Sequence, residues 1–215
     1  MDEHPKFKWL RAPGPVAEGM KVGLLGGSFN PAHEGHLHVS SVALNRLGLD
    51  YVWWLVTPQN PLKSSNGMAP FSQRLAEASK FEHHPRIVVA GFERTLGTHY
   101  TVETLRALKR RFPQINFVWL MGSDNLAGFA RWSRWPDIAQ SMPIAVVLRP
   151  GTLLAPLSSK AMQRFAAARV ANLRRLALTV PPAIGVITGP RCPQSATAIR
   201  QGRRSGALVE AGRTC

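Results

Sequence analysis

Short apolar runs alternate along the chain with longer segments in which apolar residues recur at helical spacing. The runs have the length of buried strands, and several are rich in β-branched or aromatic residues; they fall at 22–25, 51–57, 86–91, 116–121, 143–148 and 181–188. Apolar residues three or four positions apart predict helices over 34–47, 71–81 and 102–112. A composition rich in Ala, Leu and Arg predicts a further helix, with a basic face, over 152–178. Strands and helices are therefore expected to alternate along the chain.

Residues 21–48 combine a strand, a loop and a helix in one unit. The apolar run ends at Gly26-Gly27, where the backbone is expected to turn without side-chain bulk. Asn30-Pro31 is a turn signal, and the helix over 34–47 is expected to end at Gly48. A glycine loop that feeds a helix N-terminus presents backbone N–H groups and the positive end of the helix dipole. Both attract phosphate.

Two histidines lie at the start of this helix. Because His33 and His36 are three residues apart, both rings can point into the space above the glycine loop. Each ring can donate a hydrogen bond to a phosphoryl oxygen, whereas His38 falls on a different face. A generic α/β turn with incidental histidines is the plainer alternative. Two glycines, a proline and two histidines in register are more specific than that.

The stretch GGSFNPAHEGH, residues 26–36, resembles the G-G-[ST]-F-[DN]-P-x-H-x-x-H signature of the nicotinate-nucleotide adenylyltransferases, within the HxGH nucleotidyltransferase superfamily. The resemblance implies a Rossmann-like α/β fold with a parallel sheet. It also implies transfer of AMP from ATP, with Mg²⁺, to nicotinate mononucleotide, which gives deamido-NAD and pyrophosphate in NAD biosynthesis. By the same resemblance His33 and His36 are catalytic, and they bind ATP together with Gly26, Gly27, Ser28 and Phe29.

A second stretch, residues 194–200, resembles the [IL]-S-[AS]-T-x-[IL]-R signature of the same family, with Gln194 in place of the aliphatic residue. Hydroxyl groups at Ser195 and Thr197 suit the β- and γ-phosphates of ATP, and Arg200 can clamp them with two hydrogen bonds. Taken alone, such a pattern usually marks only a helix cap. Its position some 160 residues after the first signature makes it specific.

Two more resemblances extend the ATP site. Met-Gly-Ser-Asp, residues 121–124, resembles the family's [IM]-G-x-D segment, which implies that Asp124 lies near ATP. A role as a helix N-cap is also open for Asp124. Arg149, in an R-P-G turn, is implied to lie near the nucleotide. Ligands in open α/β sheets bind beyond the carboxyl ends of strands, so the loops after 22–25 and 116–121 could share one crevice.

The resemblance also implies contacts to the mononucleotide. Asn60 and Lys63, in N-P-L-K, would touch its phosphate, although a solvated loop lysine explains Lys63 almost as well. Tyr100 and Thr101 would meet the nicotinate carboxylate, with His99 where the family has serine; Thr101 could instead be a plain helix N-cap. Trp132 would stack on the pyridine ring, whereas Trp135 is expected to pack, as are Trp53 and Trp54. Arg74 resembles a family arginine to which we assign no role.

The composition limits the number of domains and the roles open to the cysteines. With 215 residues, 45% of them hydrophobic, the chain can bury one sizeable core. We expect a flexible extension at 1–20, a single nucleotidyltransferase domain at 21–203 and a disordered tail at 204–215. Two isolated cysteines, Cys192 and Cys215, support neither a disulfide framework nor a zinc site, and a cytoplasmic location fits them.

The charge leaves some alternatives open. Lys and Arg number 27 against 12 Asp and Glu, a net charge of +15 that favours anionic partners, although a solvated basic face is as good an explanation. We expect ATP and nicotinate mononucleotide as partners, and neither nucleic acid nor a membrane. The alternatives are a sister adenylyltransferase for nicotinamide mononucleotide or phosphopantetheine, and a basic nucleic-acid-binding α/β module. Oligomeric state stays open.

Overall fold

A six-stranded parallel sheet forms the centre of the protein, in the order β3-β2-β1-β4-β5-β6. The computed structural model describes residues 10–57, 67–81, 84–98, 100–148 and 158–188. Every pair of neighbouring strands is parallel, which confirms the Rossmann-like α/β fold. The strands are β1 (Lys21–Gly27), β2 (Tyr51–Val56), β3 (Ile87–Ala90), β4 (Asn116–Gly122), β5 (Ile144–Val147) and β6 (Ile184–Ile187).

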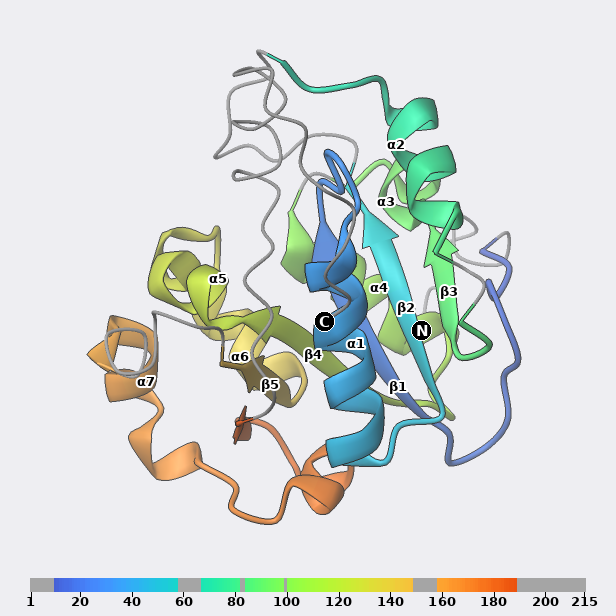
Figure 1. Ribbon diagram of the computed structural model, residues 1–215. Helices are drawn as coiled ribbons and strands as arrows, with labels where there is room; N and C mark the ends of the chain where they lie inside the picture. Colours follow the sequence, from blue (N-terminus) through green and yellow to red (C-terminus); the bar gives the residue numbers. More distant parts are fainter. Residues whose placement is uncertain (1–9, 58–66, 82–83, 99, 149–157, 189–215) are drawn as a thin grey trace.

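Helices cover both faces of the sheet (Figure 1). α1 and α2 pack on one face, together with the 3₁₀ helix η5, and α4 and α6 pack on the other. The α-helices are α1 (Glu34–Leu47), α2 (Phe71–Ser79), α3 (Phe92–Leu96), α4 (Thr101–Arg111), α5 (Ser123–Gly128), α6 (Trp135–Ser141) and α7 (Lys160–Arg164), and the 3₁₀ helices are η2 (Phe129–Arg131), η4 (Ala166–Ala168) and η5 (Leu173–Leu178). None of the helices in these ranges has the length and hydrophobicity to cross a membrane.

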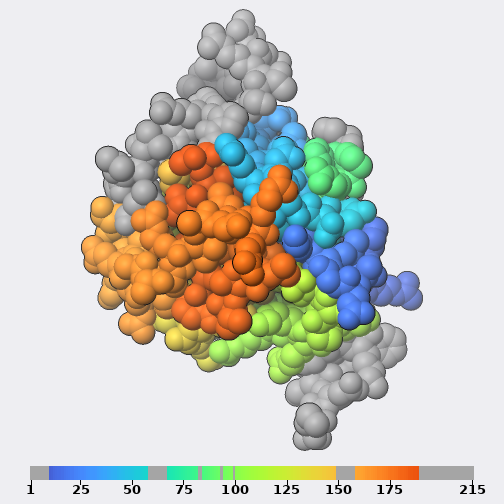
Figure 2. Space-filling view, turned by 90° about the horizontal axis from the view of Figure 1, so that it is seen from below, coloured from blue at the N-terminus to red at the C-terminus, as the bar shows by residue number. Residues whose placement is uncertain are grey.

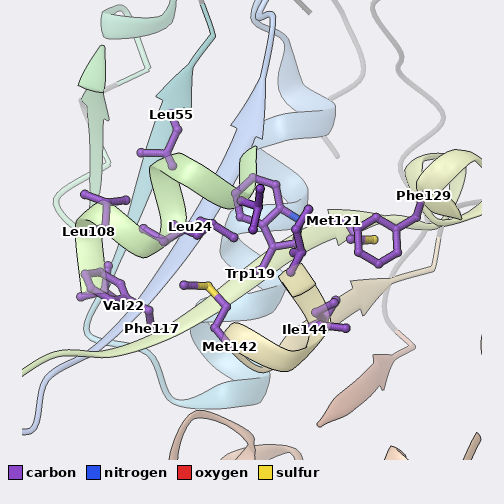
Figure 3. Packing of buried hydrophobic residues seen from close by; sticks show 14 of the residues in the cluster. Val22, Leu24, Leu55, Leu108, Phe117, Trp119, Met121, Phe129, Met142 and Ile144 are labelled. Carbon is purple, nitrogen blue, oxygen red and sulfur yellow. The ribbon is translucent and has the colours of Figure 1, made fainter. Parts of the chain in front are cut away.

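The side chains of each strand contribute to two hydrophobic cores, one on each side of the sheet, because successive side chains point to opposite sides. On β2, Trp53 faces the α4 side and Trp54 faces the α1 side, and both side chains are fully buried. This confirms that the two tryptophans belong to the core. Figure 3 shows the α4-side cluster, in which Leu24, Trp119 and Met121 meet side chains from α4 and from the start of β5.

α1 has the bounds that its apolar spacing predicts. It ends at Gly48, whose φ of 64° places it in the left-handed region that favours glycine.

The long helix predicted over 152–178 is wrong within the described residues, where the chain forms α7, η4 and η5 instead. Arg169 makes a parallel bridge to Ile184, and the Val170 N–H donates to the Ile184 carbonyl. Pairing with the edge strand overrides helix propensity here, and Figure 2 shows the segment spread across the lower surface.

The extension predicted at 1–20 is wrong for residues 10–20, which pack against the domain. Leu10 is buried in the α4-side core, and its carbonyl accepts a hydrogen bond from Arg111 Nε at 3.0 Å. Asn116 Nδ2 donates to the Gly19 carbonyl, also at 3.0 Å. Apolar burial and these two bonds order the segment. Residues 1–9 and 204–215 lie outside the described residues.

Candidate active site

The chemistry-bearing residues gather where β1 and β4, paired side by side, reach their carboxyl ends. The strand order reverses direction at this pair, with β2 and β3 on one side and β5 and β6 on the other. Ligands of open α/β sheets bind at such a switch point. β1 continues through residues 28–33 into α1, and β4 continues directly into α5. The two loops singled out by the sequence therefore begin at neighbouring strand ends.

β1 ends at Gly27, which confirms that the Gly26-Gly27 pair ends the strand, and the chain turns at Asn30-Pro31, the predicted turn signal. Both glycines belong to β1, and a Cβ on Gly26 would lie 2.3 Å from Cη2 of Trp119. Close packing of β1 on Trp119 therefore requires glycine there. Phe29 has a φ of 46°, unusual for a residue with a side chain. Its buried ring stacks on Trp54 at 5.0 Å between centroids and lies 4.6 Å from the ring of His36.

His33 and His36 form a reciprocal cap at the start of α1. His33 is the N-cap residue, and its Nδ1 accepts from the Gly35 N–H at 3.0 Å. His36 Nδ1 accepts from the His33 N–H at 3.3 Å, and the two ring centroids are 3.9 Å apart. Because both Nδ1 atoms accept, the neutral form of each ring carries its proton on Nε2. The cap thus fixes two Nε2–H donors at the positive end of a 14-residue helix.

This arrangement suits a phosphate ester that gains negative charge during a reaction. Two neighbouring imidazole donors, a helix N-terminus and the backbone of residues 27–29 lie at one strand end. Donors held in place before the reaction stabilise developing charge without having to reorganise. His38, the third histidine, takes no part in the cap.

The start of α4 differs in detail from the expectation. Tyr100 is the N-cap residue and makes no capping hydrogen bond through its side chain, and Thr101 is the first residue of the helix. Thr101 as an N-cap is therefore wrong. Tyr100 is 44% exposed and Thr101 is partly exposed, so both side chains are accessible.

A similar correction applies at α5. Gly122 is its N-cap residue, so Asp124 as an N-cap is wrong. Asp124 lies in the first turn and is exposed at the carboxyl end of β4, next to the β1 loop in the sheet. An exposed carboxylate at this edge can accept hydrogen bonds from a ligand.

Aromatic contacts fix the position of Trp132. Its ring meets Phe129 edge-on at 5.5 Å and Trp119 at 6.2 Å, and the side chain is half-buried. Trp135 packs edge-on against Phe129 and Phe165, as expected of a core residue. Trp132 and Gly26 thus share a neighbour, Trp119, which links the tryptophan to β1.

Charged groups hold the loop that follows Trp132. Asp137 Oδ2 accepts from Arg134 at 2.6 and 2.9 Å and from Arg106 of α4 at 2.9 Å. The hydrogen bond from Arg134 and then its positive charge, with a smaller contribution from Arg106, hold the pKa of Asp137 below its ordinary value. These hydrogen bonds connect Asp137, in the first turn of α6, to Arg106 of α4.

Several residues of the predicted site lie outside the described part of the chain. Among the described residues, no group of three or more His, Cys, Asp or Glu side chains is arranged to hold a metal ion. The residues that lie outside the described ranges are Asn60, Lys63, His99, Arg149, Ser195, Thr197 and Arg200, with Cys192 and Cys215.

Comparison with known proteins gives consistent matches. The Cytidylyltransferase-like family matches residues 24–202. A probable nicotinate-nucleotide adenylyltransferase of Parvibaculum lavamentivorans is 58% identical over 188 residues, which are 86% of this chain and 94% of that protein. One of Methylorubrum extorquens strain PA1 is 52% identical over 84% of this chain and 99% of that protein.

Solved structures share the fold. Nicotinic acid mononucleotide adenylyltransferase of Plasmodium falciparum, complexed with NaAD, superposes with a TM-score of 0.65 at 16% identity. The same enzyme complexed with APC superposes with a TM-score of 0.64 at 14% identity. Each match covers 85% of this chain and 83% of the other.

Proposed function

The chain belongs to the nicotinate-nucleotide adenylyltransferases, and we propose that the carboxyl ends of β1 and β4 carry out the adenylyl transfer of this family. The protein transfers AMP from ATP to nicotinate mononucleotide, which yields deamido-NAD and pyrophosphate in NAD biosynthesis. The observation that supports the proposed site best is the reciprocal cap of His33 and His36 at the start of α1.

The reaction needs alignment more than proton transfer. The phosphate of the mononucleotide is already an anion, so one of its oxygens can attack the α-phosphorus of ATP without a general base. The new P–O bond forms as the bond to the β-phosphate breaks, and pyrophosphate leaves with the electron pair. Holding both substrates in line supplies much of the rate acceleration. His33 and His36 donate through Nε2 and offset the charge that grows on the phosphoryl oxygens.

The remaining ATP contacts follow from position and chemistry. Gly26, Gly27, Ser28 and Phe29 bring backbone groups to the start of α1, and Asp124 offers a carboxylate at the end of β4. Arg149, Ser195, Thr197 and Arg200, outside the described residues, are proposed for the nucleotide and its β- and γ-phosphates on the strength of their motifs.

The mononucleotide is proposed to lie on the α4 side of this edge. Trp132, held by Phe129 and Trp119, offers an indole ring for stacking on the pyridine ring. Tyr100 and Thr101 at the start of α4 are proposed to meet the nicotinate carboxylate, where backbone N–H groups and the helix dipole favour an anion. Asn60 and Lys63 are proposed for its phosphate.

The family uses a divalent metal ion with ATP, and we propose that it is Mg²⁺. The described residues offer no cluster that could hold a metal ion by itself. At many nucleotide sites Mg²⁺ is held chiefly by phosphate oxygens and water. When bound, it would offset charge on the departing pyrophosphate. A cytoplasmic location is proposed from the isolated cysteines of the sequence.

Pyrophosphate release from ATP and Mg²⁺ tests the proposal, with nicotinate mononucleotide, nicotinamide mononucleotide and phosphopantetheine compared in parallel. We expect turnover on the acid mononucleotide well above turnover on the other two. Equal or greater turnover on the amide would contradict the proposed carboxylate contacts at the start of α4. Turnover on phosphopantetheine alone would contradict the assignment of the substrate.

A further inference from the structure

Arg74, on α2, is an arginine buried beside the β1 loop. It is 2% exposed, and among the described residues its burial sets it apart from every other lysine and arginine. Removing a charged group from water is costly unless hydrogen bonds replace the lost solvation. Desolvation lowers the pKa of Arg74, but an arginine keeps its charge at neutral pH. The burial of Arg74 therefore has to be explained by the groups with which it forms hydrogen bonds.

The guanidinium joins three separate segments through their carbonyl oxygens. Nη1 donates to Ser28 at 2.5 Å and to Thr57 at 2.7 Å, and Nε donates to Ala69 at 2.9 Å. Ser28 follows β1, Thr57 follows the neighbouring strand β2, and Ala69 precedes α2. Only a forked cation presents several donors in fixed directions in this way; the single nitrogen of lysine cannot reproduce it.

Asn30 makes a second set of hydrogen bonds on the other side of Phe29. Asn30 Nδ2 donates to the Gly67 carbonyl at 3.1 Å, and Asn30 Oδ1 accepts from the Ala69 N–H at 3.2 Å. Phe29, with its positive φ, lies between the two tied residues. A backbone conformation of this kind persists only where its surroundings hold it on both sides.

The hydrogen bond from Arg74 to the Ser28 carbonyl also sets the orientation of the Ser28–Phe29 peptide group. The C=O and N–H of a trans peptide point in opposite directions. Because the Ser28 carbonyl points at the guanidinium, the Phe29 N–H points away from Arg74. Arg74 and Thr57 lie on the β2 side of β1, whereas β4 lies on the other side. The hydrogen bond therefore turns the Phe29 donor away from the β2 side.

We propose that Arg74 is a positioning residue for adenylyl transfer, which holds the backbone at Ser28–Phe29 so that the Phe29 N–H and the His33–His36 donors act on the phosphates together. It touches no substrate and acts through the backbone of the loop. The inference rests on the proposed function, since it assumes that phosphates bind at the start of α1.

Arg74→Met and Arg74→Lys test the proposal, with Arg111→Met as a matched control. Arg111 also donates through Nε to a backbone carbonyl, that of Leu10, but it lies at the other end of α4 and outside the proposed site. The kcat, the KM for each substrate and the thermal unfolding midpoint are measured for each variant, with turnover assayed well below that midpoint.

We expect kcat to fall by roughly 10²-fold in Arg74→Met, as a misplacement of about 1 Å can cause. Arg74→Lys should lose about tenfold or more despite keeping its charge, with smaller changes in KM. Arg111→Met should stay within about twofold of wild type even where its unfolding midpoint falls equally.

A kcat near that of wild type in folded Arg74→Lys would overturn the inference, as would an equal loss in Arg111→Met. If Arg74→Met does not fold, Arg74→Lys decides the question alone. A wild-type protein that releases no pyrophosphate would overturn the proposed function instead, and the inference with it.

Discussion

Replacement of Gly26 by alanine tests how β1 packs beneath the proposed phosphate site. The added Cβ would lie 2.3 Å from Cη2 of Trp119, and 3.1 and 3.3 Å from Cζ2 and Cζ3. Carbon atoms pack favourably at about 3.5–4.0 Å, so the ring would have to retreat by roughly 1 Å or more. The Trp119 side chain is 3% exposed and rests against Trp132, which leaves the ring little room to move.

Overpacking of this kind costs about 1–3 kcal/mol of folding stability. Without the collision, the same substitution would stabilise the protein by about 0.4–1 kcal/mol, because alanine restricts the unfolded chain. A fall in folding stability would therefore indicate that the added Cβ collides with Trp119, whereas a rise would indicate that it does not. For a chain of this length, 1 kcal/mol shifts the unfolding midpoint by about 2–4 °C, so we expect Gly26→Ala to lower it by roughly 2–12 °C.

Thermal and urea unfolding of a double-mutant cycle would measure this coupling. Trp119→Leu removes the ring, so Gly26→Ala should be neutral or stabilising in that background, and the two sites should couple by about 1–3 kcal/mol. Gly27→Ala is the control, because its Cβ would come no closer than 3.3 Å to Phe29. Wild-type stability in Gly26→Ala, or an unchanged cost in the Trp119→Leu background, would refute the argument.

Two further predictions concern the α4 and α6 side of the site. The pKa of Asp137 is lowered from its ordinary value of 3.8, chiefly by Arg134, so its carboxylate stabilises the fold above that value and the contribution is lost as the pH falls through the lowered pKa. The unfolding midpoint of wild type should exceed that of Asp137→Asn at pH 7, and the difference should shrink as the pH falls below 3.8; a gap independent of pH would contradict this. Trp132→Leu should raise the KM for nicotinate mononucleotide by about two- to tenfold through lost stacking, while the KM for ATP stays nearly constant; equal rises in both would argue against stacking on the pyridine ring.

Local signals predicted much of the fold. The apolar spacing of α1 and the glycine after it gave both ends of that helix, because a left-handed cap needs no partner from elsewhere in the chain. Trp53 and Trp54 lie in a strand buried on both faces, and any burial of that strand buries both. The helix predicted over 152–178 fails because its sequence favours helix locally while β6 offers a pairing partner distant in sequence.

The sequence predicted candidate residues at the start of α1 but not their local geometry. The spacing of His33 and His36 placed both at a helix start, and sequence alone does not tell a ring that caps the helix from one that only sits near it. The positive φ of Phe29 has no sequence signal, since such a backbone is expected of glycine and two glycines stand just before it. The sequence assigns Arg74 no role beyond its resemblance to a family arginine, and its contacts with Ser28 and Thr57 show where it lies.

The turnover of His36→Ala, compared with that of His38→Ala, tests the central claim most directly. Both histidines belong to α1, but only His36 shares the reciprocal cap with His33. Loss of a donor to developing charge typically lowers kcat by about 10²–10³-fold. We expect at least that loss in folded His36→Ala, and a kcat within a few-fold of wild type in His38→Ala. Turnover near that of wild type in His36→Ala would contradict the claim that the capping histidines stabilise the phosphoryl group in transfer.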